Sequence, residues 1–336
     1  MKVGIVTQPL LNNYGGILQN YALQKVLCDL GHNPTTFDRS YKASPWWLYL
    51  CSWLKSFLCF FIPGKRRPFA KVTSVEKRLD IIEVFISKYI SKTTPVTSIS
   101  NIPHLTQDFD AIVVGSDQIW RPKYAPNIAE SFLGFLKHRN IRRIAYAVSF
   151  GVDHWEYSPK QTKVCAALAK KFDAVSVREE SGVNLCKEYL GVDAAWVLDP
   201  TLLLKKEDYS ELCKNVPVET KPFLAAYVLN IDESILTCCE TLAKERGLEL
   251  KLFSADSKAI LSISEWLAIF RDASYVVTDS FHGTVFSIIF GKEFKSLYNE
   301  IRGSARFESL LRLYESGKIE KMRDFSQKWL KKALKP

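Results

Sequence analysis

The residues most suited to chemistry stand in segment 276–284, VVTDSFHGT, where a β-branched strand ends in hydroxyl and carboxylate groups. His282 stands at the start of a predicted helix, beside Gly283, which permits the close approach of another group. An imidazole that faces a bound anion at a helix N-terminus can exchange protons near neutral pH. We therefore predict a catalytic His282, with Ser280, Gly283 and Thr284 as candidate substrate contacts. The alternative is a histidine that only caps its helix.

A second polar group follows the apolar run of segment 110–120, DAIVVGSDQIW. Ser116, Asp117 and Gln118 would stand at the carboxyl end of this buried strand, where Asp117 could accept a proton or hydroxyl hydrogen bonds. Ser116 does not stand in a G-x-S-x-G elbow, which argues against a hydrolase triad. The D-x-D string at residues 108–110 precedes its strand and fits a turn better than a metal site, so we predict no metal.

Arg178 follows another short apolar strand, residues 174–177, and is a candidate catalytic residue. Its planar guanidinium could clamp a carboxylate or a phosphate. The alternative is an internal salt bridge to Glu179 or Asp199. Two more guanidiniums stand on a predicted loop that enters a helix, and we count them as candidate substrate contacts: Arg302 and Arg306.

The loop after the first strand, residues 12–16, joins two amide side chains to two glycines and opens a predicted helix. Backbone amides and a helix N-terminus in such a loop can face an anion or a sugar, and its glycines are free to adopt positive φ. The loop lacks the G-x-G-x-x-G and Walker spacings, which argues against a nucleotide site. The alternative is a tight turn between strand and helix. The candidate substrate contacts of this loop are Asn12, Asn13, Tyr14, Gly15 and Gly16.

The elements that would position these residues alternate between short apolar runs and amphipathic stretches, which is typical of parallel sheets covered by helices. We expect an α/β protein with two Rossmann-like domains, residues 1–200 and 201–336, facing a cleft at the carboxyl ends of their strands. Pro200 stops the preceding strand, and the pattern restarts after it. Strands are expected at residues 2–7, 111–114, 143–148, 174–177, 195–198, 223–229, 248–253 and 275–278, with a further strand that closes at residues 37–38. Helices are expected at 17–30, 233–245, 264–270 and 284–290.

An apolar and basic insertion interrupts the first domain at about residues 45–70. Residues 46–62, WWLYLCSWLKSFLCFFI, are almost wholly apolar, but a bilayer span needs about 20 such residues and Lys55 lies near the middle. One interpretation is an interfacial helix with aromatics at headgroup depth, and the other is a helix buried against the domain or an oligomer partner. The candidate membrane contacts are Trp46, Trp47, Trp53, Lys65, Arg66 and Arg67.

The 336-residue chain has 46 Lys and Arg against 36 Asp and Glu, a net charge of +10 that attracts phosphate, anionic lipid or nucleic acid. It has no zinc-finger or RNP pattern and no interleaved aromatic platform, so we expect no nucleic-acid partner. Eight cysteines without a C-x-x-C motif, and an N-terminus that runs straight into a strand pattern, predict reduced thiols in the cytosol. The basic residues 318–335 are expected to form a C-terminal helix.

Six segments, taken in order, resemble the polysaccharide pyruvyl transferase family: NNYGG at 12–16, VGSDQIW at 114–120, AYAVSFG at 145–151, SVRE at 176–179, LDPT at 198–201 and TDSFHG at 278–283. No single string is diagnostic, but the ordered set is specific and covers about residues 1–310. The resemblance implies a fold similar to GT-B glycosyltransferases, phosphoenolpyruvate as co-substrate without a further cofactor, and a sugar acceptor. Members of the family set a pyruvate ketal across two hydroxyls of a glycan and release phosphate.

The resemblance implies that Arg178 and His282 bind the donor, and it adds Ser149 as a candidate substrate contact. Some branches of the family carry an Arg two residues before the histidine. Here Ser280 stands at that position, so a further cation such as Arg302, Arg306 or a lysine is expected to take its role. Phosphoenolpyruvate chemistry then suggests His282 as the acid or phosphate contact, Arg178 as the anion clamp and Asp117 as the base for the incoming hydroxyls.

The expected acceptor is a sugar of a surface polysaccharide precursor, capsule or exopolysaccharide, carried on a polyprenyl diphosphate lipid. The first domain would then bind this acceptor and the second domain the donor, at the inner, cytoplasmic face of the cell membrane. Two alternatives stay open at this point. One is a nucleotide-sugar-dependent glycosyltransferase on the same scaffold, and the other is a non-catalytic, membrane-associated scaffold for glycan assembly.

Overall fold

The computed structural model describes residues 1–39, 53, 79–96, 106–125, 127–136, 141–254, 260–297 and 303–335. The first part of the chain builds a six-stranded parallel sheet in the order β2-β1-β3-β4-β5-β6. Its central strands are short apolar runs buried on both faces, such as AIVV in β3. The strands are β1 (Lys2–Val6), β2 (Asn33–Thr36), β3 (Ala111–Val114), β4 (Arg142–Val148), β5 (Ala174–Val177) and β6 (Ala195–Trp196).

A second parallel sheet follows in the order β10-β9-β7-β8. The α/β class with two Rossmann-like sheets is therefore confirmed. One strand was not predicted, because β10 reads EFKS, lies at the sheet edge and is only half-buried or exposed along its length. The strands are β7 (Phe223–Tyr227), β8 (Glu249–Phe253), β9 (Tyr275–Thr278) and β10 (Glu293–Ser296).

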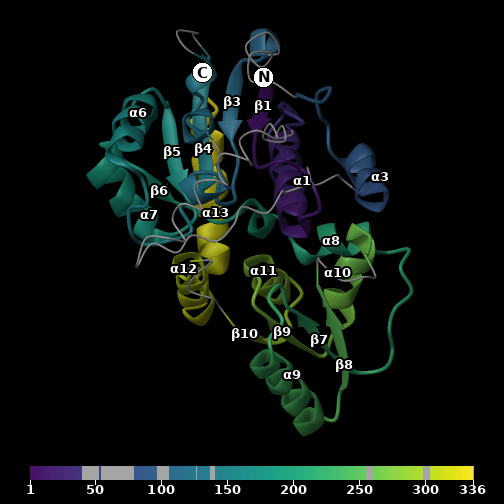
Figure 1. The fold of residues 1–336 in the computed structure, drawn as a ribbon. Coiled ribbons are helices and arrows are strands. Elements are labelled where there is room, and N and C mark those ends of the chain that lie inside the picture. Colours follow the sequence, from purple (N-terminus) through teal and green to yellow (C-terminus); the bar gives the residue numbers. More distant parts are fainter. Residues whose placement is uncertain are drawn as a thin grey trace, which may run out of the picture.

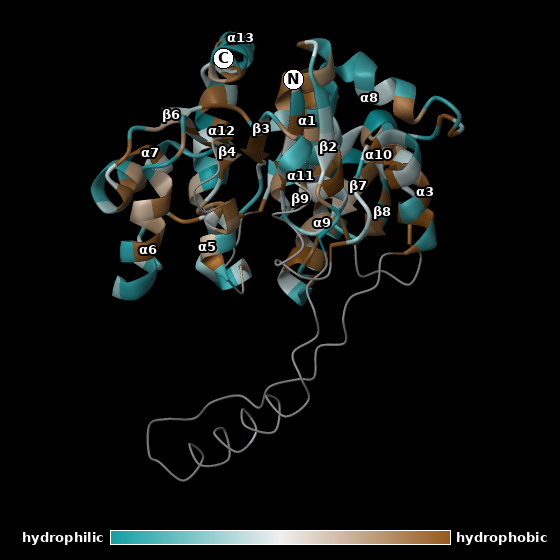
Figure 2. Ribbon diagram, turned by 90° about the horizontal axis from the view of Figure 1, so that it is seen from above, coloured by the Kyte–Doolittle hydropathy of each residue, from teal (hydrophilic) through white to brown (hydrophobic). Residues whose placement is uncertain are grey.

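Helices connect and cover the two sheets, which lie end to end with α8, α10 and α11 at their junction (Figure 1). The longer helices are α1 (Tyr14–Asp29), α3 (Asp80–Tyr89), α6 (Pro159–Ala169), α9 (Glu233–Arg246), α10 (Ile263–Asp272), α11 (Phe281–Ile289), α12 (Ala305–Glu315) and α13 (Ile319–Ala333). Shorter ones are α5 (Ile128–Ser131), α7 (Glu180–Leu185) and α8 (Lys206–Leu212). Hydrophilic residues gather on outward turns of α6 and α8, and apolar residues face the sheets (Figure 2).

The two sheets share one apolar core, which runs from Val3 in β1 to Phe223 in β7 and Leu334 after α13. Tyr14, in the first turn of α1, stacks on Trp266 of α10 with ring centroids 5.5 Å apart. The Tyr14 hydroxyl also donates to the carbonyl of Leu261 at 2.8 Å. A stacked aromatic pair adds about 0.5–1.5 kcal/mol beyond its buried area, so this contact helps fix the two sheets relative to each other.

The C-terminal helices return to the first sheet, although the sequence pattern assigns them to the second domain. Arg142 Nε of β4 donates to the carbonyl of Ala333 at 2.7 Å, and the amide of Leu198 donates to Ser326 Oγ at 2.9 Å. Ser309 of α12 accepts from the amide of Glu180 at 3.1 Å. Figure 1 shows α13 running back alongside the first sheet. This return carries α12, and with it Arg306, to the junction of the sheets.

Most of the expected membrane segment lies outside the described residues. Trp46, Trp47, Lys65, Arg66 and Arg67 are not described, and of this group the structure describes Trp53 alone, with 54% of its surface exposed. Among the described residues, no helix combines the length and the apolar character needed to cross a membrane.

Candidate functional site

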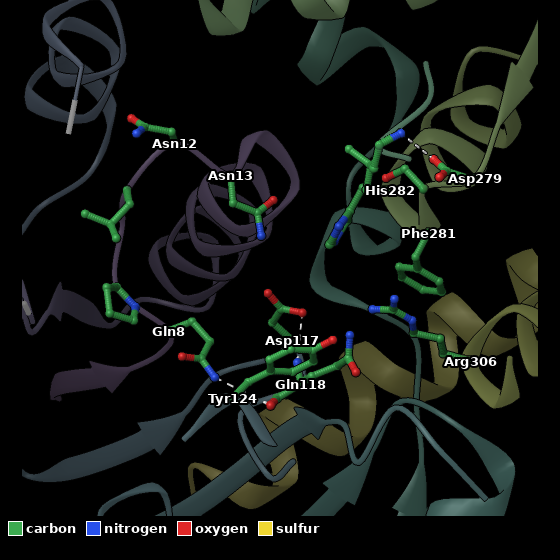
Figure 3. Close-up of a pocket in the computed structure, with 14 residues that line it drawn as sticks. Gln8, Asn12, Asn13, Asp117, Gln118, Tyr124, Asp279, Phe281, His282 and Arg306 are labelled. Carbon is green, nitrogen blue, oxygen red and sulfur yellow. Dashed lines mark hydrogen bonds between the residues drawn. The ribbon is translucent and has the colours of Figure 1, made fainter. Parts of the chain in front are cut away.

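A pocket of about 660 Å³ lies between the two sheets, at the carboxyl ends of β1, β3 and β9. Open α/β sheets bind their ligands at this edge. Figure 3 shows the loop before α1 on one side and the start of α11 opposite, with Asp117 near the centre and Arg306 below Phe281. The lining residues are Gln8, Pro9, Leu11, Asn12, Asn13, Asp117, Gln118, Tyr124, Leu229, Asp279, Ser280, Phe281, His282 and Arg306.

The N-termini of α1 and α11 both reach this pocket. Asn13 caps α1 by accepting from the amide of Gly16 at 3.2 Å, and Ser280 caps α11 by accepting from the amide of Gly283 at 3.3 Å. Helix N-termini carry unpaired amides and a positive dipole end, which favour a bound anion. Both helices begin three residues earlier than predicted, because the polar caps, and not the first apolar residues, set the helix starts.

Gly15 lies in the first turn of α1, and neither Gly15 nor Gly16 adopts the positive φ that glycine permits. Gly15 is needed for close approach. A Cβ atom at Gly15 would lie 2.0 Å from Nδ1 of His282 and 2.7 Å from its Cβ. The start of α1 and the imidazole of α11 are therefore in direct contact across the junction of the sheets.

His282 and Arg178 converge on one buried carboxylate, that of Asp199. Arg178 Nη1 lies 2.7 Å from Asp199 Oδ2, and His282 Nε2 lies 3.7 Å from the same oxygen. The salt bridge to Asp199 that competed with the clamp interpretation is thus present. Arg178 does not line the pocket, but its Nε and Nη2 atoms are buried without a hydrogen-bond partner. Arg178 thus places a buried positive charge behind the pocket wall, between the carboxylates of Asp199 and Asp117.

Asp199 is fully buried and stays ionised. Burial raises the pKa of this carboxyl, but the nearby imidazole of His282, the charge of Arg178 and the hydrogen bond from Thr201 together outweigh burial and hold the pKa well below its usual range. Thr201 donates both its amide, at 3.0 Å, and its hydroxyl, at 2.6 Å, to Asp199 Oδ1. The sequence analysis named Asp199 only as a partner for Arg178, although its position directly after a strand was a usable signal.

Arg306 is a buried cation on the pocket wall with 8% of its surface exposed. No carboxylate of the described residues forms an ion pair with it, and its Nε atom has no hydrogen-bond partner. Burial, together with the nearby charge of Arg178, lowers the pKa of Arg306 to about 10. Both guanidiniums lie close to the Phe281 ring, Arg178 at 4.4 Å and Arg306 at 5.4 Å from its centroid. Since a buried charge without a counterion is costly, this wall favours an anionic ligand.

Asp117 brings a carboxylate to the pocket from the carboxyl end of β3. Its backbone has a φ of 76°, which is uncommon for a residue other than glycine. This conformation changes the direction of the chain at the end of the strand. The amide of Ser149 donates to the Asp117 carbonyl at 3.0 Å, and the amide of Gln118 donates to Asp117 Oδ1 at 2.8 Å. The carboxylate lies 3.7 Å from Arg178 Nη2 and is partly exposed to the pocket.

A family model of polysaccharide pyruvyl transferases matches residues 13–300. This range includes Asn13, Asp117, Arg178, Asp199, Asp279 and His282. The chain belongs to the polysaccharide pyruvyl transferase family. The resemblance drawn from the ordered motifs is thereby confirmed. No curated protein matches the chain significantly.

This family member is also similar, at low identity, to solved structures. The chain is similar to UDP-GlcNAc 2-epimerase from Neisseria meningitidis bound to UDP-GlcNAc, at 12% identity over 99% of each chain and a TM-score of 0.46. It is also similar to the alpha-glucosyltransferase (AGT) in complex with UDP, at 9% identity over 98% of this chain and 95% of that one, with a TM-score of 0.45. At these values the likeness concerns the fold alone.

Two serines of the pyruvyl transferase motifs, Ser116 and Ser149, do not line the pocket and instead hold residues behind its wall. Ser116 Oγ donates to Asp199 Oδ2 at 3.0 Å, and Ser149 Oγ donates to Glu179 Oε1 at 3.1 Å. Both serines are fully buried. Gln118 does line the pocket, and its Oε1 accepts from Arg121 Nη1 at 3.1 Å.

Three further predicted contacts of the pyruvyl transferase motifs have partners inside the protein. Asn12 lines the pocket and accepts from the amide of Leu79 at 3.1 Å. Thr284 is buried, and its hydroxyl contacts Ser296 Oγ at 2.8 Å. Gly283 leaves room for Thr278, because a Cβ atom at Gly283 would lie 2.2 Å from Thr278 Oγ1. The remaining predictions divide by place: Tyr14 lies at the junction of the sheets, Ser280 lines the pocket, and Arg302 lies outside the described residues.

Glu179, beside Arg178 in the chain, was named only as a possible salt-bridge partner. Its buried Oε1 accepts from the amides of Phe150 at 2.6 Å and Gly151 at 3.0 Å, besides Ser149. Burial raises the pKa of Glu179, although the charge of Arg178 opposes this. Glu179 thus fixes the loop after β4. Asp279 in the same way fixes the loop after β7, because its carboxylate accepts from the amides of Leu229 at 2.7 Å and Asn230 at 3.0 Å.

Proposed function

We propose that this protein transfers a pyruvyl group from phosphoenolpyruvate to two hydroxyls of a sugar, forming a ketal and releasing phosphate. The observation that carries the proposal is Arg306, a buried guanidinium on the pocket wall without an anionic partner among the described residues. Together with the start of α11 and the charge of Arg178 behind the wall, it offers positive charge for a small substrate with a carboxylate and a phosphate.

His282 is the proposed acid. Phosphoenolpyruvate becomes electrophilic at C2 when C3 receives a proton, which His282 would supply from the pocket wall. The first sugar hydroxyl then forms a bond to C2 and gives its proton to Asp117, which lies across the pocket (Figure 3). The C2–O bond to phosphate breaks next, and the second hydroxyl takes its place and loses its proton. One proton ends on C3 and one on phosphate, so the two hydroxyl protons are accounted for.

The neutral part of the pocket is the proposed acceptor side. Gln8, Asn12 and Asn13 come from the loop between β1 and α1, and Tyr124 offers a half-exposed aromatic ring beside them. Amides and one aromatic ring suit the hydroxyls and the apolar face of a sugar. The pocket of about 660 Å³ has room for the donor and at least one sugar ring.

The experiment is incubation of the protein with phosphoenolpyruvate and a panel of free and lipid-linked sugars, followed by mass measurement of the products and assay of released phosphate. The expected result is a sugar that gains one pyruvate ketal for each phosphate released. His282→Ala and Arg178→Ala should each lower turnover by about 10²-fold or more. Transfer of label from a nucleotide sugar, or wild-type turnover in both variants, would rule out the proposal.

The acceptor is further proposed to be a polyprenyl-diphosphate-linked sugar, met by the protein as a peripheral partner of the cytoplasmic membrane face. The support is the sequence of residues 46–67, in which an aromatic, apolar run is followed by Lys65, Arg66 and Arg67. Sedimentation with anionic vesicles tests this. A variant without residues 46–62 should lose vesicle binding, whereas unchanged sedimentation would contradict the membrane role and leave the pyruvyl transfer itself intact.

A further inference from the structure

The buried Asp199 carboxylate contacts both residues to which the donor chemistry is assigned, without lining the pocket itself. It joins elements that are far apart in the chain. Asp199 follows β6 of the first sheet, Arg178 follows β5, and His282 opens α11 of the second sheet. Asp199 has no exposed surface on its side chain, so it cannot reach a substrate and can act only through its neighbours.

The hydrogen bonds to Asp199 leave it little freedom to turn. Thr201 donates twice to Oδ1, and Arg178 and Ser116 donate to Oδ2 at 2.7 and 3.0 Å. Four donors fix the plane of the carboxylate, and Oδ2 then faces Nε2 of His282 at 3.7 Å. Nε2 is buried and has no hydrogen-bond partner, and the Asp199 oxygen is a carboxylate acceptor that faces this atom.

The other imidazole nitrogen faces a different environment. Nδ1 lies against Gly15, where a Cβ atom would come within 2.0 Å of it. His282 lines the pocket although its Nε2 is buried, which leaves Nδ1, at the edge of the ring beside Gly15, as the ring nitrogen not turned toward Asp199. A carboxylate that binds one ring nitrogen sets which nitrogen carries the proton in the neutral imidazole.

We propose that Asp199 is a positioning residue that holds a proton on Nε2 of His282 and thereby leaves Nδ1 as the nitrogen that exchanges protons with the substrate. The catalytic part rests on the proposed function, but the tautomer itself does not. The carboxylate also supports the protonated imidazole against the cations nearby. The charged groups around the ring are Asp199, Asp117 and Asp279, and against them Arg178 and Arg306.

The first test is the nitrogen-15 spectrum of the histidine side chains in the substrate-free protein. The chain has five histidines, and the signals that vanish in His282→Ala identify His282. The expected neutral form carries its proton on Nε2. A neutral form with the proton on Nδ1 would overturn the proposal, and this measurement needs neither a variant of Asp199 nor any turnover.

The second test is Asp199→Asn, which keeps the shape of the side chain and removes its charge. Because loss of an orienting carboxylate leaves a catalytic histidine in the wrong tautomer, kcat should fall by about 10²-fold or more. The proton should shift toward Nδ1 in the nitrogen-15 spectrum, and the alkaline limb of the kcat profile should move to lower pH. A lower kcat with unchanged spectrum and unchanged pH limb would show a merely structural role and contradict the proposal.

Asp272→Asn is the matched control. Asp272 is another buried aspartate, paired with Arg271 at 2.7 Å, but it ends α10 before β9 begins, at the opposite end of the sheet from the pocket. It should lower stability without moving the His282 signals or the pH limb. If wild-type protein transfers no pyruvyl group at all, the proposed function fails, and the substrate-free spectrum still decides the tautomer.

Discussion

Gly15→Ala should remove most of the activity through a single methyl group. The added Cβ would lie 2.0 Å from Nδ1, 2.2 Å from Cγ and 2.7 Å from Cβ of His282. Ordinary contacts begin near 3.4 Å, so the ring must move by about 1.4 Å. Rotation of the side chain alone cannot relieve the clash, because the contact includes the His282 Cβ at the root of the side chain. A misplacement of about 1 Å can cost about 10²-fold in rate, and we expect kcat to fall by at least that factor.

Gly16→Ala is the matched control, since Gly16 lies in the same helical turn. A Cβ there meets Asn13 Nδ2 at 3.3 Å, a contact that a small shift relieves. Alanine favours a helix over glycine by up to about 1 kcal/mol, so propensity should not destabilise either variant. The assay compares kcat for pyruvyl transfer with the melting temperature of both proteins. A folded Gly15→Ala protein with at least half of the wild-type turnover would refute the role given to His282.

Two further variants test the charges. Arg306→Met should raise KM for phosphoenolpyruvate about tenfold or more, since a charged hydrogen bond contributes about 1.5–3 kcal/mol. Calorimetry should show an unchanged or higher melting temperature, because the variant removes a buried charge without a counterion. An unchanged KM would contradict the anion site. Burial raises the pKa of Asp272, but the hydrogen bonds from Arg271 and the amide of Glu219, together with the nearby positive charges, outweigh burial and lower the pKa. The stability that Asp272 adds is therefore present above the unfolded pKa and is lost as pH falls. The stability gap between wild type and Asp272→Asn, measured by urea unfolding, should therefore shrink below about pH 4, and a constant gap would be evidence against this pairing.

The sequence predicts most of the fold, because the parallel strands are continuous apolar runs with a polar group at their carboxyl ends. It places Asp117, His282 and Arg178 after three such strands, and the facing carboxyl ends of the two sheets then bring them to the junction. The edge strand β10 escapes prediction because its alternating charged residues carry no such run. The return of α13 to the first sheet depends on long-range contacts such as Arg142 with Ala333, which no local pattern encodes.

The roles of individual site residues are harder to predict than their location. Glycines after a strand suggest positive φ, but the need for Gly15 comes from His282, more than 260 positions away in the chain. Ser116 follows a strand like Asp117, yet alternation along the chain turns it toward Asp199 and away from the pocket. Arg306 was one of several cations that could replace the arginine missing at Ser280, and only its burial without a counterion among the described residues distinguishes it.

The most direct test of the site is an experimental structure of the protein with phosphoenolpyruvate bound. The account predicts that one anionic group of the ligand lies within hydrogen-bond distance of Arg306 and the start of α11, with C3 of the enol toward Nδ1 of His282. A ligand bound elsewhere on the protein, or one in this pocket with C3 turned away from His282, would contradict it.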